Sequence, residues 1–336
     1  MTAAVGAAAT TPRGSLGSEP YGAAQTEFQL LGPVVVRDGA SHVVIVPPGP
    51  KQRSLLAALV LHAGRPLSVD QLVEELWGDR PPGNAANALQ AHVARLRRVL
   101  PEPAVPVPGQ EWITTLPTGY LLSADQATTD VQRFHQLSAK GRAAVAADPG
   151  YATRLLRRAL SLWRGPALQD SRHGPICTHE ADRLEENRLT ALESLYEASL
   201  GCGRHGEITG ELEKLTVDHP LHERFYDLLM VALYRGGRQA EALGVYERAR
   251  RRLTEALGIE PGPALRSRLE AILNHAPHLS APAPQGAPRS PATLDEALEL
   301  GGEIARLQQR IDELNRRQEA LVRRFDAMVD ALPETP

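Results

Sequence analysis

Cysteine, lysine, aromatic residues and long apolar runs are all scarce in this sequence of 336 residues. The two cysteines, Cys177 and Cys202, fit neither a disulfide framework nor a common zinc spacing, so we expect a reducing environment and no metal site. No apolar run approaches the ~20 residues that a membrane-spanning helix needs. No segment has the pattern of a signal peptide. The composition therefore predicts a cytoplasmic protein that does not contact a membrane.

Motifs of nucleotide binding and catalysis are also missing. The sequence holds no GxxxxGKS/T phosphate loop, no nucleophile elbow and no HExxH pair. The adjacent carboxylates Glu74 and Glu75 point in different directions on a predicted helix, as do Glu185 and Glu186. Both are therefore poor acid–base pairs. We expect neither catalysis nor a cofactor, and interpret the protein as a non-enzyme.

Residues 84–120 carry the most information about function. Their first part predicts a basic amphipathic helix. The apolar stripe of this helix, which would pack on a core, consists of Leu89, Val93, Leu96 and Leu100. The opposite face holds amides, small residues and guanidinium groups without any acid, and it consists of Asn84, Asn87, Ala91, Ala94, Arg95 and Arg98. Asparagine and arginine hydrogen-bond adenine and guanine edges in the major groove of DNA, so this segment predicts a recognition helix.

The residues around this helix predict a winged helix-turn-helix. Residues 28–46 contain β-branched runs split by one Asp-Gly turn, which is a strand–turn–strand signal. Two amphipathic helices follow at residues 51–62 and 69–77, the second capped by Ser68. After the basic helix, residues 113–121 have the alternation and the Pro-Thr-Gly turn of a short hairpin. The order of strands, three helices and a hairpin is that of a winged helix.

A set of motifs resembles one family of proteins. The string VARLRRVL at 93–100, after LQAH and before a GY hairpin, resembles the DNA-binding domain of OmpR-type response regulators. Together with ALSLWRGPAL at 159–168, HPLHER at 219–224 and LGIEP at 257–261, it resembles the SARP family of transcriptional activators of antibiotic gene clusters. The likeness covers about residues 27–275. It implies binding to direct repeats near the −35 region of double-stranded promoter DNA, and recruitment of RNA polymerase through its sigma factor and other subunits.

Helical periodicity dominates from residue 130 onward. Segments separated by Gly/Pro turns are expected near 131–147, 152–163, 179–201, 207–217, 222–235, 239–256 and 263–274. Antiparallel helix pairs of this size form a solenoid like tetratricopeptide repeats. The stretch 232–249 fits such a repeat best, with Ala240 and Ala242 where helices touch and Tyr246 as a large packing residue. The resemblance implies that this part is a bacterial transcriptional activation domain.

The expected fold is mostly α. An N-terminal winged helix-turn-helix with small antiparallel sheets precedes a tetratricopeptide-like α-solenoid, and a C-terminal coiled-coil helix follows. The predicted domains are a disordered tail at 1–26, an OmpR-type winged-helix DNA-binding domain at 27–126, the helical bacterial transcriptional activation domain at 127–275, a Pro/Ala linker at 276–293 and a coiled-coil helix at 294–332.

The C-terminal segment predicts a homodimer on DNA. Its apolar residues repeat at alternating steps of four and three over about four heptads. The expected dimer contacts are Ile304, Leu307, Ile311, Leu314, Leu321 and Phe325. The alternative is a helix that folds back on the helical domain. We favour the coiled coil because the linker separates the segment and the apolar stripe is narrow.

The helix face, the wing and the start of the first helix supply the expected DNA contacts. These are Lys51, Arg53, Asn84, Asn87, Gln90, Arg95, Arg97, Arg98, Thr115 and Thr118. Lys51 and Arg53 either anchor a phosphate or are ordinary solvated charges. In the loop between the second and third helices, the resemblance implies that Asp79 and Arg80 contact RNA polymerase. A formal net charge of −3 leaves one alternative open, a helical scaffold whose winged helix binds proteins.

Overall fold

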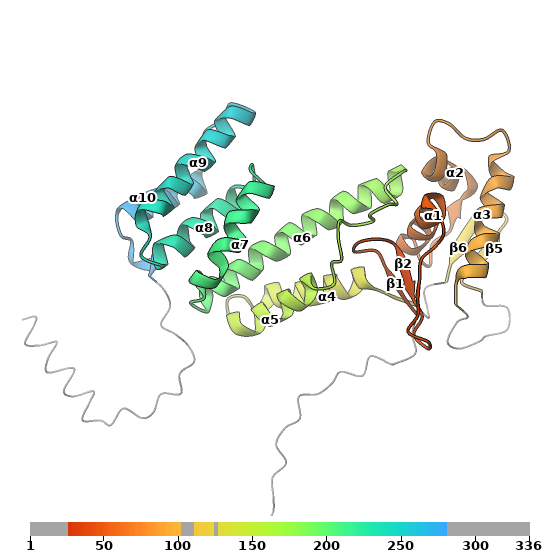
Figure 1. Ribbon diagram of the computed structural model, residues 1–336, viewed down its shortest axis with the longest axis horizontal. Helices are drawn as coiled ribbons and strands as arrows, with labels where there is room; N and C mark the ends of the chain where they lie inside the picture. Colours follow the sequence, from red (N-terminus) through yellow and green to blue (C-terminus); the bar gives the residue numbers. More distant parts are fainter. Residues whose placement is uncertain (1–25, 102–110, 124–126, 281–336) are drawn as a thin grey trace, which may run out of the picture. The chain divides into compact units, whose positions relative to one another are not determined.

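The computed structural model describes residues 26–101, 111–123 and 127–280. Figure 1 shows two parts among these residues: a winged-helix part, residues 26–123, and a helical part, residues 127–280. Short strands accompany the helices of the first part, and successive helices make up nearly all of the second. This mostly helical fold with small sheets agrees with the sequence prediction, except that the strand Ala127–Thr129 runs parallel, and not antiparallel, to its neighbour Thr26–Gln29. The predicted coiled coil, with all its expected dimer contacts, lies outside the described residues.

The helices and wing of the winged-helix part follow the predicted order. Its strands, with the short strand that follows the wing, are β1 (Thr26–Gln29), β2 (Val35–Arg37), β3 (Val44–Ile45), β4 (Leu67–Ser68), β5 (Ile113–Leu116), β6 (Gly119–Leu122) and β7 (Ala127–Thr129). Its helices are α1 (Pro50–Leu61), α2 (Val69–Trp77) and α3 (Ala85–Val99). The strands form two sheets, with the orders β3-β2-β1-β7 and β4-β6-β5. The sequence did not predict β4 and β7, because strands of two and three residues are too short to show periodicity.

The apolar run that precedes the Asp-Gly turn forms two strands, β1 and β2. The run breaks at Gly32, which has a φ of +141° and where a Cβ would lie 3.0 Å from the Cβ of Arg164. The break brings the backbone amides of Leu30 and Leu31 to the carboxylate of Asp130, at 2.8 and 2.9 Å. The predicted strand–turn–strand around Asp38-Gly39 is confirmed by the antiparallel pairing of β2 with β3. The residues before the turn form two strands because the tertiary hydrogen bonds at Leu30 and Leu31 interrupt the run.

Helix α2 begins where the sequence predicts, because its first turn is capped. The hydroxyl of Ser68 accepts a hydrogen bond from the amide of Gln71 at 3.1 Å, and the Gln71 side chain accepts one from the Ser68 amide at 3.0 Å. This reciprocal capping box satisfies amides that have no partner within the helix. It also fixes where β4 ends and α2 begins.

The helical part consists of consecutive helices that pack against their neighbours in sequence (Figure 1). They are α4 (Asp130–Ala144), α5 (Pro149–Leu160), α6 (Pro175–Gly201), α7 (His205–Asp218), α8 (Glu223–Arg235), α9 (Gln239–Leu257), α10 (Pro263–Leu273) and the short 3-10 helix η1 (Pro277–Leu279). In α9, Ala242 and Tyr246 are buried as predicted. Ala240 is exposed, so its expected helix contact was wrong. Residues two apart lie about 200° apart around a helix, so Ala240 and Ala242 face different sides.

Two hydrophobic cores hold these elements together. The first extends from Phe28 of β1 to Ala198 of α6 and is shared by the winged-helix part and helices α4 to α6. The second extends from Tyr196 of α6 to Leu279 of η1. Leu279 falls within the predicted linker, yet it is 1% exposed and belongs to this core. The boundary predicted at residue 126 remains a prediction, and the two parts that it separates share one core.

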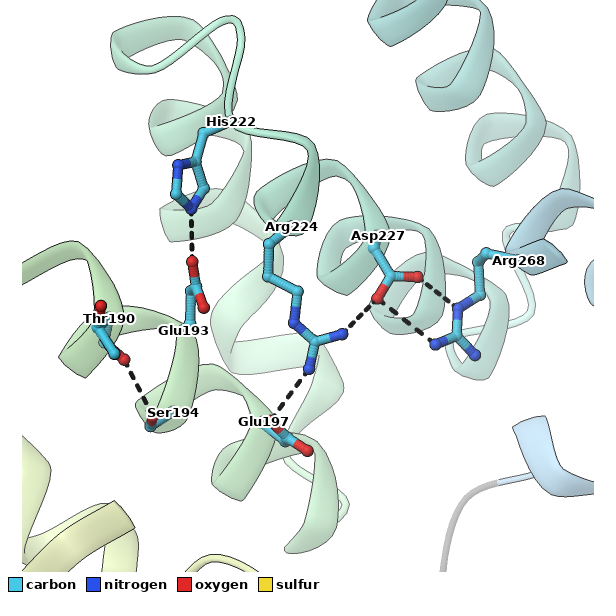
Figure 2. A network of polar contacts seen from close by, with 8 residues as sticks. All are labelled: Thr190, Glu193, Ser194, Glu197, His222, Arg224, Asp227 and Arg268. Carbon is cyan, nitrogen blue, oxygen red and sulfur yellow. Dashed lines mark hydrogen bonds and ion pairs between the residues drawn. The ribbon is translucent and has the colours of Figure 1, made fainter. Parts of the chain in front are cut away.

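A polar network joins three helices of the helical part (Figure 2). Asp227 of α8 is buried and accepts hydrogen bonds from Arg224 of the same helix at 2.6 Å and from Arg268 of α10 at 2.5 Å. Arg224 also donates to Glu197 of α6 at 3.0 Å. A buried carboxylate needs such partners, so the network links the packing of α6, α8 and α10.

Candidate nucleic-acid interface

Helix α3 divides into a buried stripe and an exposed face, as its sequence predicts. Leu89, Val93 and Leu96 are at most 1% exposed and pack in the first core. The exposed face consists of Asn87, Gln90, Ala91, Ala94, Arg95 and Arg98. Within the described part of the chain, Arg95 and Arg98 take part in no ion pair. The face therefore presents amides and two unpaired guanidinium groups to solvent.

Asn84 has a different role from the other predicted contacts on this helix. It is the N-cap of α3, and its side-chain oxygen accepts a hydrogen bond from the backbone amide of Asn87 at 3.2 Å. Capping by asparagine satisfies a helix amide that would otherwise lack a partner. Asn84 therefore positions the helix, and its oxygen is already engaged, whereas the Asn87 side chain is exposed on the first turn.

The wing lies against the start of α2. Strands β5 and β6 pair from Ile113 opposite Leu122 to Leu116 opposite Gly119, and β4 pairs with the other edge of β6. At Gly119 a Cβ would lie 1.9 Å from the carbonyl oxygen of Leu67, so only glycine permits this approach. Gly119, the first residue of the Gly-Tyr pair, is therefore required by the pairing of β4 with β6.

Arg97 connects α3 to the wing. Its guanidinium donates hydrogen bonds to the carbonyl of Ile113, the shorter at 2.6 Å, and to the hydroxyl of Thr115 at 2.8 Å. It also pairs with Glu111 at 3.1 Å. The sequence predicts that both Arg97 and Thr115 contact DNA, but the structure joins them to each other. Arg97 orients the wing on the helix, and Thr118 remains exposed near its tip.

Lys51 and Arg53, at the start of α1, both have partners within the protein. The Lys51 ammonium donates to the carbonyl of Leu76 at 2.7 Å and lies 4.7 Å from the centre of the Trp77 ring. Partial burial lowers the pKa of Lys51 from its ordinary value. Arg53 donates to the carbonyl of Pro47 at 3.3 Å. Neither is an ordinary solvated charge, and Lys51 supports the end of α2.

The predicted polymerase-contacting loop lies between α2 and α3. Gly78 ends α2 with a φ of +52°, and its amide donates to the carbonyl of Glu74 at 2.8 Å. Asp79 and Arg80 follow, and both are exposed. The amide of Arg80 is held by the carbonyl of Trp77 at 3.1 Å. The loop therefore presents one acid and one base from a backbone anchored at its first residues.

The role of Glu75 was not predicted from the sequence. This residue of α2 is 0% exposed, and its carboxylate accepts hydrogen bonds from the amides of Ile176 at 2.7 Å and Cys177 at 3.2 Å. It thus caps the N-terminus of α6. The signal was present in the sequence, because Glu75 follows Leu72 by three residues and precedes Leu76 on the same apolar stripe. An acid on such a stripe indicates a buried partner.

Among the described residues, no helix is long and apolar enough to span a membrane. In the same residues, no cluster of three or more His, Cys, Asp or Glu side chains has the arrangement of a metal site. The two cysteines, both in helices or at their ends, are unpaired.

Comparisons with known families match both parts of the chain. Residues 45–122 match the family described as "Transcriptional regulatory protein, C terminal". Residues 129–273 match the family described as "Bacterial transcriptional activator domain". The two matched regions correspond to most of the winged-helix part and nearly all of the helical part.

Individual relatives agree with these matches. The chain is 45% identical to the transcriptional regulator RedD of Streptomyces coelicolor over 76% of this chain and 73% of RedD. It is 36% identical to the regulatory protein DnrI of Streptomyces peucetius over 81% of this chain and 99% of DnrI. A solved structure of Mycobacterium tuberculosis EmbR in complex with a low-affinity phosphopeptide matches with a TM-score of 0.69 and 36% identity, over 75% of this chain and 66% of that chain. With both families matched and with these regulators as relatives, the chain belongs to the SARP family of transcriptional activators.

Proposed function

We propose that the exposed face of α3 binds the major groove of promoter DNA and that the chain activates an antibiotic or other secondary-metabolite gene cluster. In this proposal Asn87, Gln90, Arg95 and Arg98 lie nearest the bases, and Thr118 meets phosphate at the wing. Lys51, Arg53, Asn84, Arg97 and Thr115 act mainly by holding α1, α3 and the wing in place, because each has a partner within the protein.

The observation that carries this proposal is the pairing state of the arginines. Arg97 is occupied by the wing, whereas Arg95 and Arg98 are exposed and lack ion pairs among the described residues. No acid occurs from Ala85 to Val99 to repel a phosphate or cancel these charges. An exposed, acid-free helix with unpaired guanidinium groups suits guanine edges and the backbone of DNA.

The test is selection of binding sites from random double-stranded DNA, followed by affinity measurements at several salt concentrations. We expect one recurring sequence arranged as direct repeats. Arg95→Ala and Arg98→Ala should each weaken specific binding by about 1–3 kcal/mol and relax the preference at one base position. Arg238→Ala is the matched control, since this exposed arginine pairs with Glu241 on α9 and should leave binding unchanged.

A different result would favour the alternative function. Equal retention of all DNA sequences, with no effect of either arginine variant, would indicate that the winged helix binds a protein. The formal net charge of −3 is the observation that motivates this alternative.

Recruitment of RNA polymerase is the second half of the proposal. Asp79 and Arg80 are exposed on a loop that lies between the start of α3 and the end of α2. We propose that this loop, with the helical part, contacts the sigma factor and other polymerase subunits. Two copies would bind the direct repeats as a homodimer through the predicted C-terminal coiled coil.

A further inference from the structure

A cavity lies where the winged-helix part meets α4 and α6. Its inner chamber has a volume of about 240 Å³. The walls are mainly apolar and come from both parts of the chain, with Phe28, Val60 and Leu122 on one side and Val131 on the other. Cavities between structural units, lined by apolar residues with a few polar groups, are a common place for small ligands. We call this space and its outer extension the junction cavity.

The outer chamber of the junction cavity is wider and carries positive charge. It has a volume of about 710 Å³ and shares Leu61 and Ala63 with the inner chamber. Arg65, Arg183 and two histidines line it, and the one acid in its lining is Glu180. Glu180 is already paired with Arg183, at 2.5 and 2.8 Å. Arg65 is exposed and enters no ion pair in the described part of the chain, so an uncompensated cation remains.

One polar atom beside the inner chamber lacks a partner. The Nε2 atom of His135, which lines this chamber, is buried and has no hydrogen-bond partner among the described residues. Burial, together with the charge of Arg183, lowers the pKa of His135, which favours its neutral ring. Buried polar atoms in native proteins are nearly always hydrogen-bonded. A ligand in the inner chamber would supply a partner that the protein does not.

We propose that the junction cavity binds a small amphipathic organic anion, whose apolar body fills the inner chamber and whose acidic group lies near Arg65. The apolar walls favour an apolar ligand body, and the uncompensated charge of Arg65 favours an anionic group on the ligand. Because residues of both parts line the cavity, such a ligand would contact the winged-helix part and the helical part at once. This inference does not depend on the proposed function, since binding is measured on the protein without DNA.

The test uses two fluorescent probes with related aromatic bodies on the full-length protein. The probe 8-anilino-1-naphthalenesulfonate is anionic, and N-phenyl-1-naphthylamine lacks the sulfonate. We expect saturable binding of both, with the anion bound more tightly. Arg65→Gln should weaken the anion roughly three- to fivefold and leave the neutral probe unchanged. Ala63→Phe enlarges a residue that lines both chambers and should weaken both probes.

A control variant distinguishes probe binding in the junction cavity from probe binding in a second groove. Arg248, Arg251 and Arg252 line a groove on α9 that also combines charge with apolar residues, so Arg251→Gln tests whether the anionic probe binds there. Loss of binding in Arg251→Gln, with full binding in Arg65→Gln, would overturn the proposal. Arg65 is exposed and unpaired, so its variant remains decisive even if Ala63→Phe does not fold. Absence of saturable binding to the wild-type protein would also overturn it.

Discussion

The carboxylate of Glu75 accepts a hydrogen bond from the backbone amide of Ile176 at 2.7 Å, across 101 positions of sequence. The contact joins α2, the helix that precedes α3, to the first turn of α6. A negative charge at a helix N-terminus is stabilised by the unpaired amides there. The chain approaches so closely that a Cβ at Gly174 would lie 2.4 Å from the backbone of Glu75. The two parts of the molecule are therefore fixed to each other through α2.

Removing the charge of Glu75 should loosen this junction. Glu75→Gln keeps the shape but turns one acceptor into a donor that faces a backbone amide. We expect the free energy of unfolding to fall by about 1.5–3 kcal/mol, measured by urea denaturation. Glu74→Gln is the control, because Glu74 is exposed on the same helix and its replacement should change stability by less than about 0.5 kcal/mol. Equal effects of the two changes would contradict the assigned role.

Asp130 should make stability depend on pH. Burial raises the pKa of Asp130 from 3.8 to about 6, although the amides of Leu30 and Leu31 and the charge of Arg164 act in the opposite direction. A raised carboxyl pKa means that the folded protein holds the proton more tightly than the unfolded chain. Protonation of Asp130 therefore stabilises the folded protein fully below about pH 3.8, and this stabilisation is lost as pH rises through about 6.

Comparison with Asp130→Asn isolates this group. The unfolding free energy of the wild type, relative to the variant, should decrease by up to about 3 kcal/mol between pH 4 and pH 7. Chemical denaturation of both proteins at matched pH values measures this difference. A constant difference across that range would show that Asp130 ionises normally in the folded protein.

Arg97 and Arg98 are neighbours with separable roles. Arg97→Ala removes the bonds to Ile113 and Thr115, so it should lower the free energy of unfolding by about 1–3 kcal/mol and weaken DNA binding through a displaced wing. Arg98→Ala should leave unfolding unchanged and weaken only specific binding. Denaturation and DNA affinity measured on the same preparations distinguish them. An unstable Arg98→Ala protein would show that Arg98 also has a structural role.

The loop after α2 should act in transcription without acting in DNA binding. Replacing Asp79 and Arg80 together by alanine removes its two charges and leaves the anchoring backbone bonds intact. We expect unchanged DNA affinity and a reduced yield of transcript from a purified polymerase system. Full activation by this double variant would exclude the loop as a polymerase contact.

The predicted coiled coil is tested by truncation after Ser280. An earlier end would remove Leu279, whose side chain is buried and whose carbonyl accepts a hydrogen bond from Arg235 at 2.9 Å. We expect light scattering to give a dimer for the full chain and a monomer for the truncated one. Leu307→Asp with Leu314→Asp should have the same effect, because it places charge at two core positions of the heptads. A full-length monomer would favour the alternative of intramolecular packing.

Sequence periodicity by itself determined the positions of the helices and the two faces of α3. The buried stripe through Leu89, Val93 and Leu96 follows from a repeat of 3.6 residues, which needs no knowledge of the partner surface. The same repeat gave the helices from α4 to α10, with bounds that shift by only a few residues. Short strands such as β4 and β7 were not predicted, because they form only by pairing with strands that are distant in the sequence.

Which polar residues are free to bind a partner depends on contacts between segments that are distant in the sequence. Arg97 and Arg98 are adjacent arginines on the same helix. The wing, 16 positions away in the sequence, accepts hydrogen bonds from Arg97, whereas Arg98 stays exposed. Glu75 and Asp130 are both buried against backbone amides about 100 positions away, and no local pattern identifies those partners. The local sequence pattern indicates which side of a helix is apolar. The partner of a buried charge is set by the packing of segments that are far apart in the chain.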